Sequence, residues 1–177
     1  MKKIILPVLS LFLLGALLAF AVPTGWAIAR NHSIAFTTSG VSGIFKTFSG
    51  TIAFDEANPA ASRFDVTIDV ASINTGNGLQ NKHAKSADWF NAATYPSIRF
   101  TSKKFVKSGA AYLVTGDLTV HGITREASLP FTFRKTPAGG LFTGTFAINR
   151  TDFRIGAPGG EVGEVIKLAV SVPVTKK

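Results

Sequence analysis

The sequence contains no cysteine among its 177 residues. The chain therefore forms no disulfide, and its stability must come from packing and strand pairing. The same absence excludes thiol catalysis and an acyl anchor carried on a cysteine. We therefore expect the mature product to be a soluble protein.

Motifs for catalysis and metal binding are also missing. His32, His83 and His121 are the only histidines, and none of them has the close spacing of a typical zinc site. The chain has no G-x-S-x-G elbow, P-loop or dinucleotide fingerprint, and its glycine-rich stretch at 156–163 joins two expected strands. We predict no metal site, no cofactor and no catalytic residue, and hence a protein that is not an enzyme.

Charge is absent from Ile4 to Ala21, directly after the positive start Met1-Lys2-Lys3. This uncharged run closes with Ala19-Phe20-Ala21, a small-x-small arrangement that suits a signal peptidase. A retained membrane anchor is the alternative, because 18 apolar residues lie at the lower edge of what spans a bilayer. We predict a cleaved signal peptide over residues 1–21, one domain over residues 22–177, and a periplasmic or secreted location.

The charge balance of the mature chain is positive. Loss of Lys2 and Lys3 lowers the net charge from +9 to about +7, which suits transient contact with an anionic membrane surface. The basic residues are spread singly between strand-like runs and form no stripe. We therefore expect no nucleic-acid partner.

Alternation of apolar and polar residues with period two dominates the rest of the chain. Phe64, Val66, Ile68 and Val70 alternate with polar neighbours, and similar runs recur between turn residues. The eight runs lie at about 26–36, 44–55, 63–70, 97–106, 111–120, 124–134, 142–150 and 166–174. Their short links predict an all-β protein, an eight-stranded antiparallel up-and-down barrel resembling lipocalins, with a two-sheet sandwich as the alternative.

One connection, residues 74–96, is much longer than the others. Its stretch 79–90 lacks alternation and contains good helix formers, which predicts a short helical segment between strands three and four. Connections of this length in a compact domain are usually functional. The segment is either a gate over the barrel mouth or a plain end cap.

Phenylalanine is abundant, with 15 in the chain against two Trp and two Tyr. Many of these rings fall on the apolar side of their strand, so they are expected to point into the barrel. The candidate lining residues are Phe36, Phe48, Phe54, Phe64, Ile68, Phe100, Leu118, Phe131, Phe133 and Phe146. A barrel of eight strands is either filled by its own side chains or holds one small ligand, and the pattern leaves both possibilities open.

Several segments resemble the YceI-like family, a lipocalin-like group of exported polyisoprenoid-binding proteins. The matching segments run in order along the chain: Trp26-Ala27-Ile28, Gly50-Thr51-Ile52-Ala53-Phe54-Asp55, Lys82-His83, Ser86-Ala87-Asp88-Trp89-Phe90, Tyr95-Pro96-Ser97-Ile98-Arg99-Phe100, Gly116-Asp117-Leu118-Thr119-Val120-His121-Gly122 and Ile148-Asn149-Arg150-Thr151-Asp152-Phe153. Gln80, Asn81, Ala84 and Lys85 depart from the family pattern beside His83. The identity of a polar headgroup therefore does not follow from the resemblance.

The resemblance implies a barrel with a short helical segment at one end and a long apolar channel for an isoprenoid. We expect Trp89 near the capped end of that channel, and His83 and Asp88 either at its mouth or as structural residues of the cap. The function expected is sequestration or carriage of a polyisoprenoid such as a prenylated quinone or isoprenoid lipid. The alternatives are a non-catalytic interaction module of a stress or redox system with a filled barrel and, third, a lipid-modifying enzyme.

Overall fold

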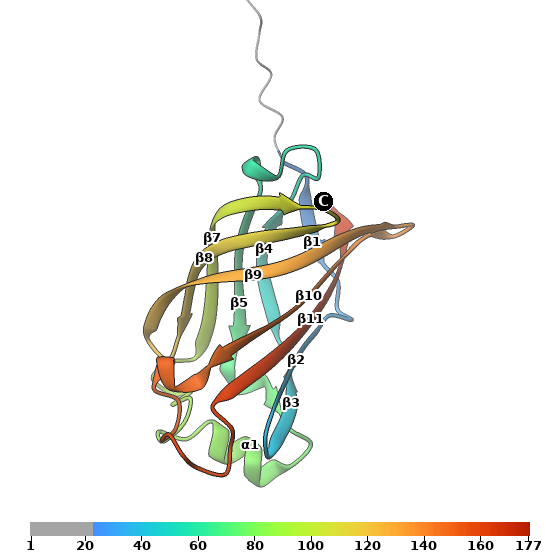
Figure 1. The fold of residues 1–177 in the computed structure, drawn as a ribbon. Coiled ribbons are helices and arrows are strands. Elements are labelled where there is room, and N and C mark those ends of the chain that lie inside the picture. The colour runs from blue at the N-terminus through green and yellow to red at the C-terminus, as the bar shows by residue number, and fades with distance from the viewer. Residues whose placement is uncertain (1–22) are drawn as a thin grey trace, which may run out of the picture.

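A computed structural model describes residues 23–177, which fold into one closed antiparallel barrel with a single α-helix (Figure 1). The elements in chain order are β1 (Gly25–Ile28), β2 (Ser33–Thr38), β3 (Val41–Phe45), β4 (Phe48–Ala53), η1 (Pro59–Ala61), β5 (Arg63–Asp69), η2 (Val70–Ser72), β6 (Ile73–Asn74), α1 (Gly78–Ala84), β7 (Ser97–Ser108), β8 (Ala111–Val120), β9 (Ile123–Thr136), β10 (Gly139–Asn149), η3 (Arg150–Phe153) and β11 (Val165–Lys176). The predicted signal peptide lies outside the described residues. Within residues 23–177, no helix is long and apolar enough to cross a membrane.

The eight predicted strands are all present, and the predicted barrel is confirmed. The first three are broken into the pairs β1/β2, β3/β4 and β5/β6, which the sequence pattern did not predict. At the first break the chain stays attached to β11, because the amide of Ala29 donates to the carbonyl of Pro173 at 2.9 Å. The third break is η2, where the Asp69 carboxylate accepts from the amide of Ala71 at 2.9 Å.

Closure of the barrel depends on the first and last strands. β1 pairs with β4 on one side and with β11 on the other, from Trp26 opposite Lys176 to Ile28 opposite Val174. β2 pairs further along β11, from Ser33 opposite Ser171 to Thr37 opposite Lys167. The ladder thus runs around the whole ring, which removes exposed sheet edges over much of the wall.

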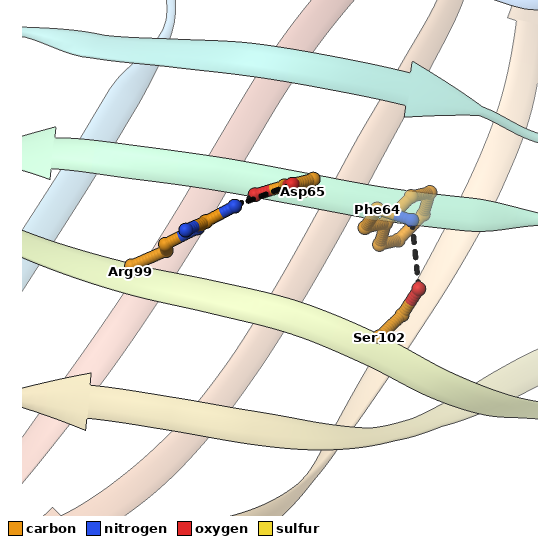
Figure 2. Close-up of polar contacts among 4 residues, drawn as sticks. All are labelled: Phe64, Asp65, Arg99 and Ser102. Carbon is orange, nitrogen blue, oxygen red and sulfur yellow. Dashed lines mark hydrogen bonds and ion pairs between the residues drawn. The ribbon is translucent and has the colours of Figure 1, made fainter. Parts of the chain in front are cut away.

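The seam between β5 and β7 is joined by side chains as well as by its backbone ladder (Figure 2). On the outer face, the Arg99 guanidinium donates two hydrogen bonds to the Asp65 carboxylate, at 2.9 and 2.7 Å. Where a β-bulge interrupts β7, the Ser102 hydroxyl accepts from the Phe64 amide at 2.8 Å. A side chain therefore extends this seam beyond its regular ladder.

The helical segment covers one end of the barrel, opposite the C-terminus (Figure 1). The Asn77 side chain accepts from the amides of Leu79 and Gln80 and so caps the start of α1. The helix spans Gly78–Ala84, and turns replace it over residues 85–90, so the helical part is shorter than the predicted stretch 79–90. The predicted helical segment between strands three and four is confirmed.

Candidate ligand-binding site

The barrel encloses a cavity of about 640 Å³ at the end capped by α1. Its wall comes from nearly every strand and is almost entirely apolar. The wall residues on the strands include Ile34, Phe36, Phe45, Phe48, Ile52, Phe64, Val66, Ile68, Ile98, Phe100, Val114, Leu118, Val120, Leu129, Phe131, Phe142, Phe146, Ile148, Ile166, Leu168, Val170 and Val172. This volume lies within the usual range of small-molecule sites, about 300–1,000 Å³. We call this part of the barrel the hollow end.

The other part of the barrel interior is filled by rings, and we call it the aromatic end. Its members are Trp26, Phe54, Phe64, Phe105, Tyr112, Phe131, Phe133 and Phe142. Phe54 is at the centre, with its ring centroid 5.0 Å from that of Tyr112 and 5.2 Å from that of Phe133, both edge-to-face. Burial raises the pKa of the Tyr112 hydroxyl, and nearby Glu56 adds to that effect. The rings leave no continuous channel through this end.

The floor of the cavity is formed by rings that belong to both ends. Phe64, Phe131 and Phe142 line the cavity and also contact one another, at centroid distances of 5.5 to 5.9 Å. Between these three rings and the cap, the wall residues are mostly Val, Ile and Leu, whose side chains are shorter than a phenylalanine ring. The cavity therefore begins above this layer of three mutually contacting rings.

The cap is held by a chain of aromatic and polar contacts. The Trp89 indole N–H donates to Nε2 of His83 at 2.6 Å, which requires a neutral imidazole with its proton on Nδ1. The Phe90 ring meets that of Phe45 edge-on at 6.0 Å and so ties the segment to β3. His83, Trp89 and Phe90 all line the cavity, which places the cap directly over it.

A buried arginine, Arg150, anchors the loop that completes the capped end. Arg150 is only 2% exposed, its guanidinium lies 5.2 Å from the Trp89 ring, and it lines the cavity. It donates at 2.7–3.2 Å to the carbonyls of Ile155, Ala157, Val162 and Gly163. One planar group with fixed donors thus holds the whole turn between η3 and β11.

Polar atoms of the wall gather at the capped end. Besides His83 and Arg150, the lining there includes Thr38, Thr75, Gln80 and Glu161. The opposite floor is made of phenylalanine rings. This arrangement matches an amphiphile whose polar group lies under the cap and whose hydrocarbon part points toward the rings.

Metal chemistry finds no support in this geometry. In residues 23–177, no group of three or more His, Asp or Glu side chains lies close enough to hold a metal ion. His32 contacts the carbonyl of Ala29 at 2.9 Å, and His121 contacts that of Phe153 at 3.1 Å. Each of these two histidines makes a local structural contact instead.

Comparison with known proteins places this geometry in a family. The family model described as the YceI-like domain matches residues 26–174, which is nearly the whole barrel. The chain belongs to the YceI-like family. Protein YceI of Escherichia coli O157:H7 and a UPF0312 protein of Photorhabdus laumondii are each 39% identical to it over 136 residues. Those matches cover 73% of this chain and 71% of each relative.

Solved structures agree with the YceI-like fold. BcnA of Burkholderia cenocepacia superposes with a TM-score of 0.80 at 28% identity, over 84% of this chain and 99% of that one. A YceI protein of Campylobacter jejuni gives a TM-score of 0.68 at 30% identity, over 80% and 87% of the two chains. A polyisoprenoid binding domain of Saccharophagus degradans gives 0.67 at 14% identity, over 88% and 99%, and shares the fold.

Most of the residues predicted from the YceI-like sequence to line a channel lie on the cavity wall. These are Phe36, Phe48, Phe64, Ile68, Phe100, Leu118, Phe131, Phe146 and Trp89, joined by His83 at the cap. Phe54 and Phe133 lie instead in the aromatic end, away from the lining, and Asp88 is exposed on the outside of the cap. The alternation places all of these rings inside the barrel but does not distinguish its two ends.

Arg150 was missed as a site residue, although its position carried a signal. On β10 the inward residues are Phe142, Gly144, Phe146 and Ile148, and Arg150 continues the same parity directly after the strand. A charged residue at an inward position is rare unless its donors are satisfied. That parity, together with the glycine-rich loop that follows, would have identified it.

Proposed function

We propose that this YceI-like protein binds an apolar or amphiphilic ligand inside its barrel without catalysing a reaction on it. The observation that carries the proposal is the cavity of about 640 Å³, with an apolar wall and most of its polar groups near the capped end. The ligand class is a polyisoprenoid, such as a prenylated quinone or an isoprenoid lipid. The polyisoprenoid binding domain of Saccharophagus degradans, which shares the fold, supports this class.

The energetics of such binding come mainly from removing hydrocarbon from water. At about 0.8 kcal/mol per CH₂, each five-carbon isoprene unit gains roughly 3–4 kcal/mol. Ordering the flexible chain and losing its free motion offset part of this gain. A few buried units are therefore enough for stable binding, with the polar group under the cap near His83 and Gln80.

The proposed setting is the periplasm or the exterior of the cell, after cleavage of residues 1–21. A protein that carries a water-insoluble lipid there must exchange it with a membrane. The excess of basic over acidic residues in the mature chain favours brief contact with anionic headgroups. Sequencing the N-terminus of the exported protein tests the cleavage, which should leave Val22 first.

The direct test is native mass spectrometry of gently purified mature protein, followed by lipid extraction. We expect a mass increment that matches an isoprenoid lipid found in the extract. A barrel that carries no lipid and takes up none when offered one would support the interaction-module function instead. Turnover of an added lipid would indicate an enzyme.

Affinity is measurable with the protein's own fluorescence, because its two tryptophans lie in different places. Trp89 lines the cavity, and Trp26 lies in the aromatic end, where its indole N–H donates to the Phe54 carbonyl at 3.1 Å. In the Trp26→Phe variant, added prenylated quinone should quench Trp89 saturably. The matched Trp89→Phe variant, which keeps only Trp26 behind the floor of rings, should show much weaker quenching.

A further inference from the structure

The seam between β9 and β10 differs from the other seams of the barrel because its ladder ends early. Pairing runs from Gly139 opposite Thr136 to Thr143 opposite Thr132 and stops there. Both strands continue, β9 back to Ile123 and β10 on to Asn149, each paired only with its other neighbour. In Figure 1 the two strands diverge from their common hairpin.

A proline lies close to the point at which the pairing ends. A Cβ placed on Gly144 would lie 2.7 Å from the carbonyl oxygen of Pro130, so the carbonyl of Pro130 points toward β10. In antiparallel pairing a residue bonds the same neighbour with its N–H and its C=O. Pro130 has no N–H, so one of the two hydrogen bonds that the next bonded pair would exchange cannot form.

A side-chain contact marks each end of the unpaired stretch. Next to the end of the ladder, the hydroxyls of Thr132 and Thr143 lie 2.7 Å apart on the outer face. At the other end, the Arg125 side chain donates to the Asp152 carbonyl at 2.9 Å, which ties the start of β9 to η3. The slot between these ties covers residues 126–131 of β9, which is six residues or roughly 20 Å at the usual rise along a strand.

At the start of this slot, residues whose side chains point outward take part in the cavity lining. Pro130 and Thr143 alternate with the buried, inward Phe131 and Phe142, so their side chains point outward. Both nevertheless line the cavity, as does Gly144 between the strands. At the paired seam between β5 and β7, the outward residues Asp65 and Arg99 take no part in the lining.

The slot begins beside the floor of rings. Phe131 and Phe142, which form that floor, are the immediate chain neighbours of Pro130 and Thr143. A hydrocarbon chain that extends from the cap to the floor cannot continue into the aromatic end. Leu129 on β9 and Phe146 on β10 line the cavity on the two sides of the slot, where no ladder joins the strands.

We propose that the slot between residues 126–131 of β9 and 144–149 of β10 is a side portal for the hydrocarbon tail of the ligand. The tail enters and leaves through it, and a tail longer than the cavity emerges from it. This inference rests on the proposed function. It adds that the ligand class includes linear chains too long to fit in the enclosed volume.

The experiment uses the absence of cysteine from the chain, because introduced thiols are then the only ones. Ser128→Cys and Ala147→Cys place two exposed thiols on opposite sides of the slot, and a short bismaleimide joins them after folding. The matched control pair is Thr145→Cys with Ala169→Cys, exposed partners across the fully paired seam of β10 and β11. Unlinked samples of both variants report any effect of the substitutions themselves.

Loading and release of a long-tailed prenylated quinone are followed by quenching of Trp89 in the Trp26→Phe background. We expect the bismaleimide across the slot to slow both rates by about tenfold or more, with a much smaller change in affinity. The control link should leave both rates unchanged. If the slot-linked protein exchanges quinone as fast as the unlinked one, the portal is overturned and the ligand must pass the capped end.

A single-cysteine variant tests the emerging tail separately. The thiol of Ala147→Cys should react more slowly with a small maleimide when the protein holds a long-tailed quinone than when it holds a short-tailed one. Equal labelling rates with both bound quinones would contradict a tail in the slot. If the unlinked protein binds neither quinone, the proposed function itself fails, which the titration shows before any link is made.

Discussion

The two ends of the barrel are built from the same strands with the same alternation, yet one is filled and the other is hollow. In the aromatic end, Phe54 meets four other rings at centroid distances of 5.0 to 5.5 Å. In the hollow end, mostly aliphatic side chains line a cavity of about 640 Å³. The difference shows that ring contact across the axis, rather than strand number, decides where this barrel has room for a ligand.

The largest expected effect is that of Phe54→Ala. The Phe54 side chain is 1% exposed and contacts rings on all sides, so its removal should lower the free energy of unfolding by about 3–5 kcal/mol. Phe48→Ala is the matched change on the cavity wall, where the ring already borders open space, and should cost only about 1–2 kcal/mol. Urea unfolding of the lipid-free proteins measures both.

Ligand affinity should reverse this order. Phe48→Ala should weaken quinone binding by about tenfold, near 1.4 kcal/mol, whereas the folded fraction of Phe54→Ala should bind as the parent does. Phe54→Leu offers a milder change if the alanine variant does not fold. Equal losses of stability at the two positions would mean that the two ends do not differ.

The next largest effect concerns added volume. A Cβ on Gly140 would lie 2.4 Å from the Phe133 ring, so Gly140→Ala should overfill the aromatic end and cost about 1–3 kcal/mol. Val170→Phe adds far more volume, but into the cavity, and should change stability by less than about 1 kcal/mol while blocking the ligand. Thermal unfolding together with a quinone titration checks the pair. A strongly destabilised Val170→Phe would refute an open interior.

The smallest effect is expected outside the barrel, at the ion pair that closes the seam of β5 and β7. The hydrogen bond from Arg99 lowers the pKa of the Asp65 carboxyl in the folded state. The pair therefore stabilises the fold above the unfolded pKa of about 3.9 and loses that contribution as the pH falls through the folded value. Asp65→Asn should be slightly less stable than the parent at pH 7, and the difference should vanish in acid.

That difference should be smaller than for any of the interior variants, because both side chains are partly exposed and solvent screens them. Urea unfolding at several pH values measures it, with Arg99→Gln as the partner control. A difference that grows in acid would have the wrong sign for this pair.

Much of the fold could be predicted from the sequence because strand alternation is a local property. The run Phe64, Val66, Ile68 identified β5, and the unpatterned stretch after Gly78 identified the helical segment. The sides of the strands that face inward followed from the same parity. The closed ring of eight strands then followed from short connections.

The division of the interior could not be predicted, because it depends on contacts across the barrel. Phe54 and Phe36 look alike in the sequence, but only Phe54 meets rings from β8, β9 and β10. The role of Arg150 depends on four carbonyls in a loop with no regular structure. The sequence shows that a proline lies within the strand at 124–134. It does not show which neighbouring strand the Pro130 peptide group faces, and therefore which seam stays unpaired.

The closure of the ring by β1 and β11 also sets the order in which the molecule can be assembled. The amide of Lys177 donates to the carbonyl of Gly25 at 3.1 Å, so the last contact of the ring joins residues separated by almost the entire chain. Contacts of such long sequence separation form late and slow folding, because a very large loop must close first. While residues 165–176 are still unavailable, β1 and β2 have no partner on that side and the cavity has no complete wall. The barrel can therefore enclose its cavity only after residues 165–176 have become available for pairing.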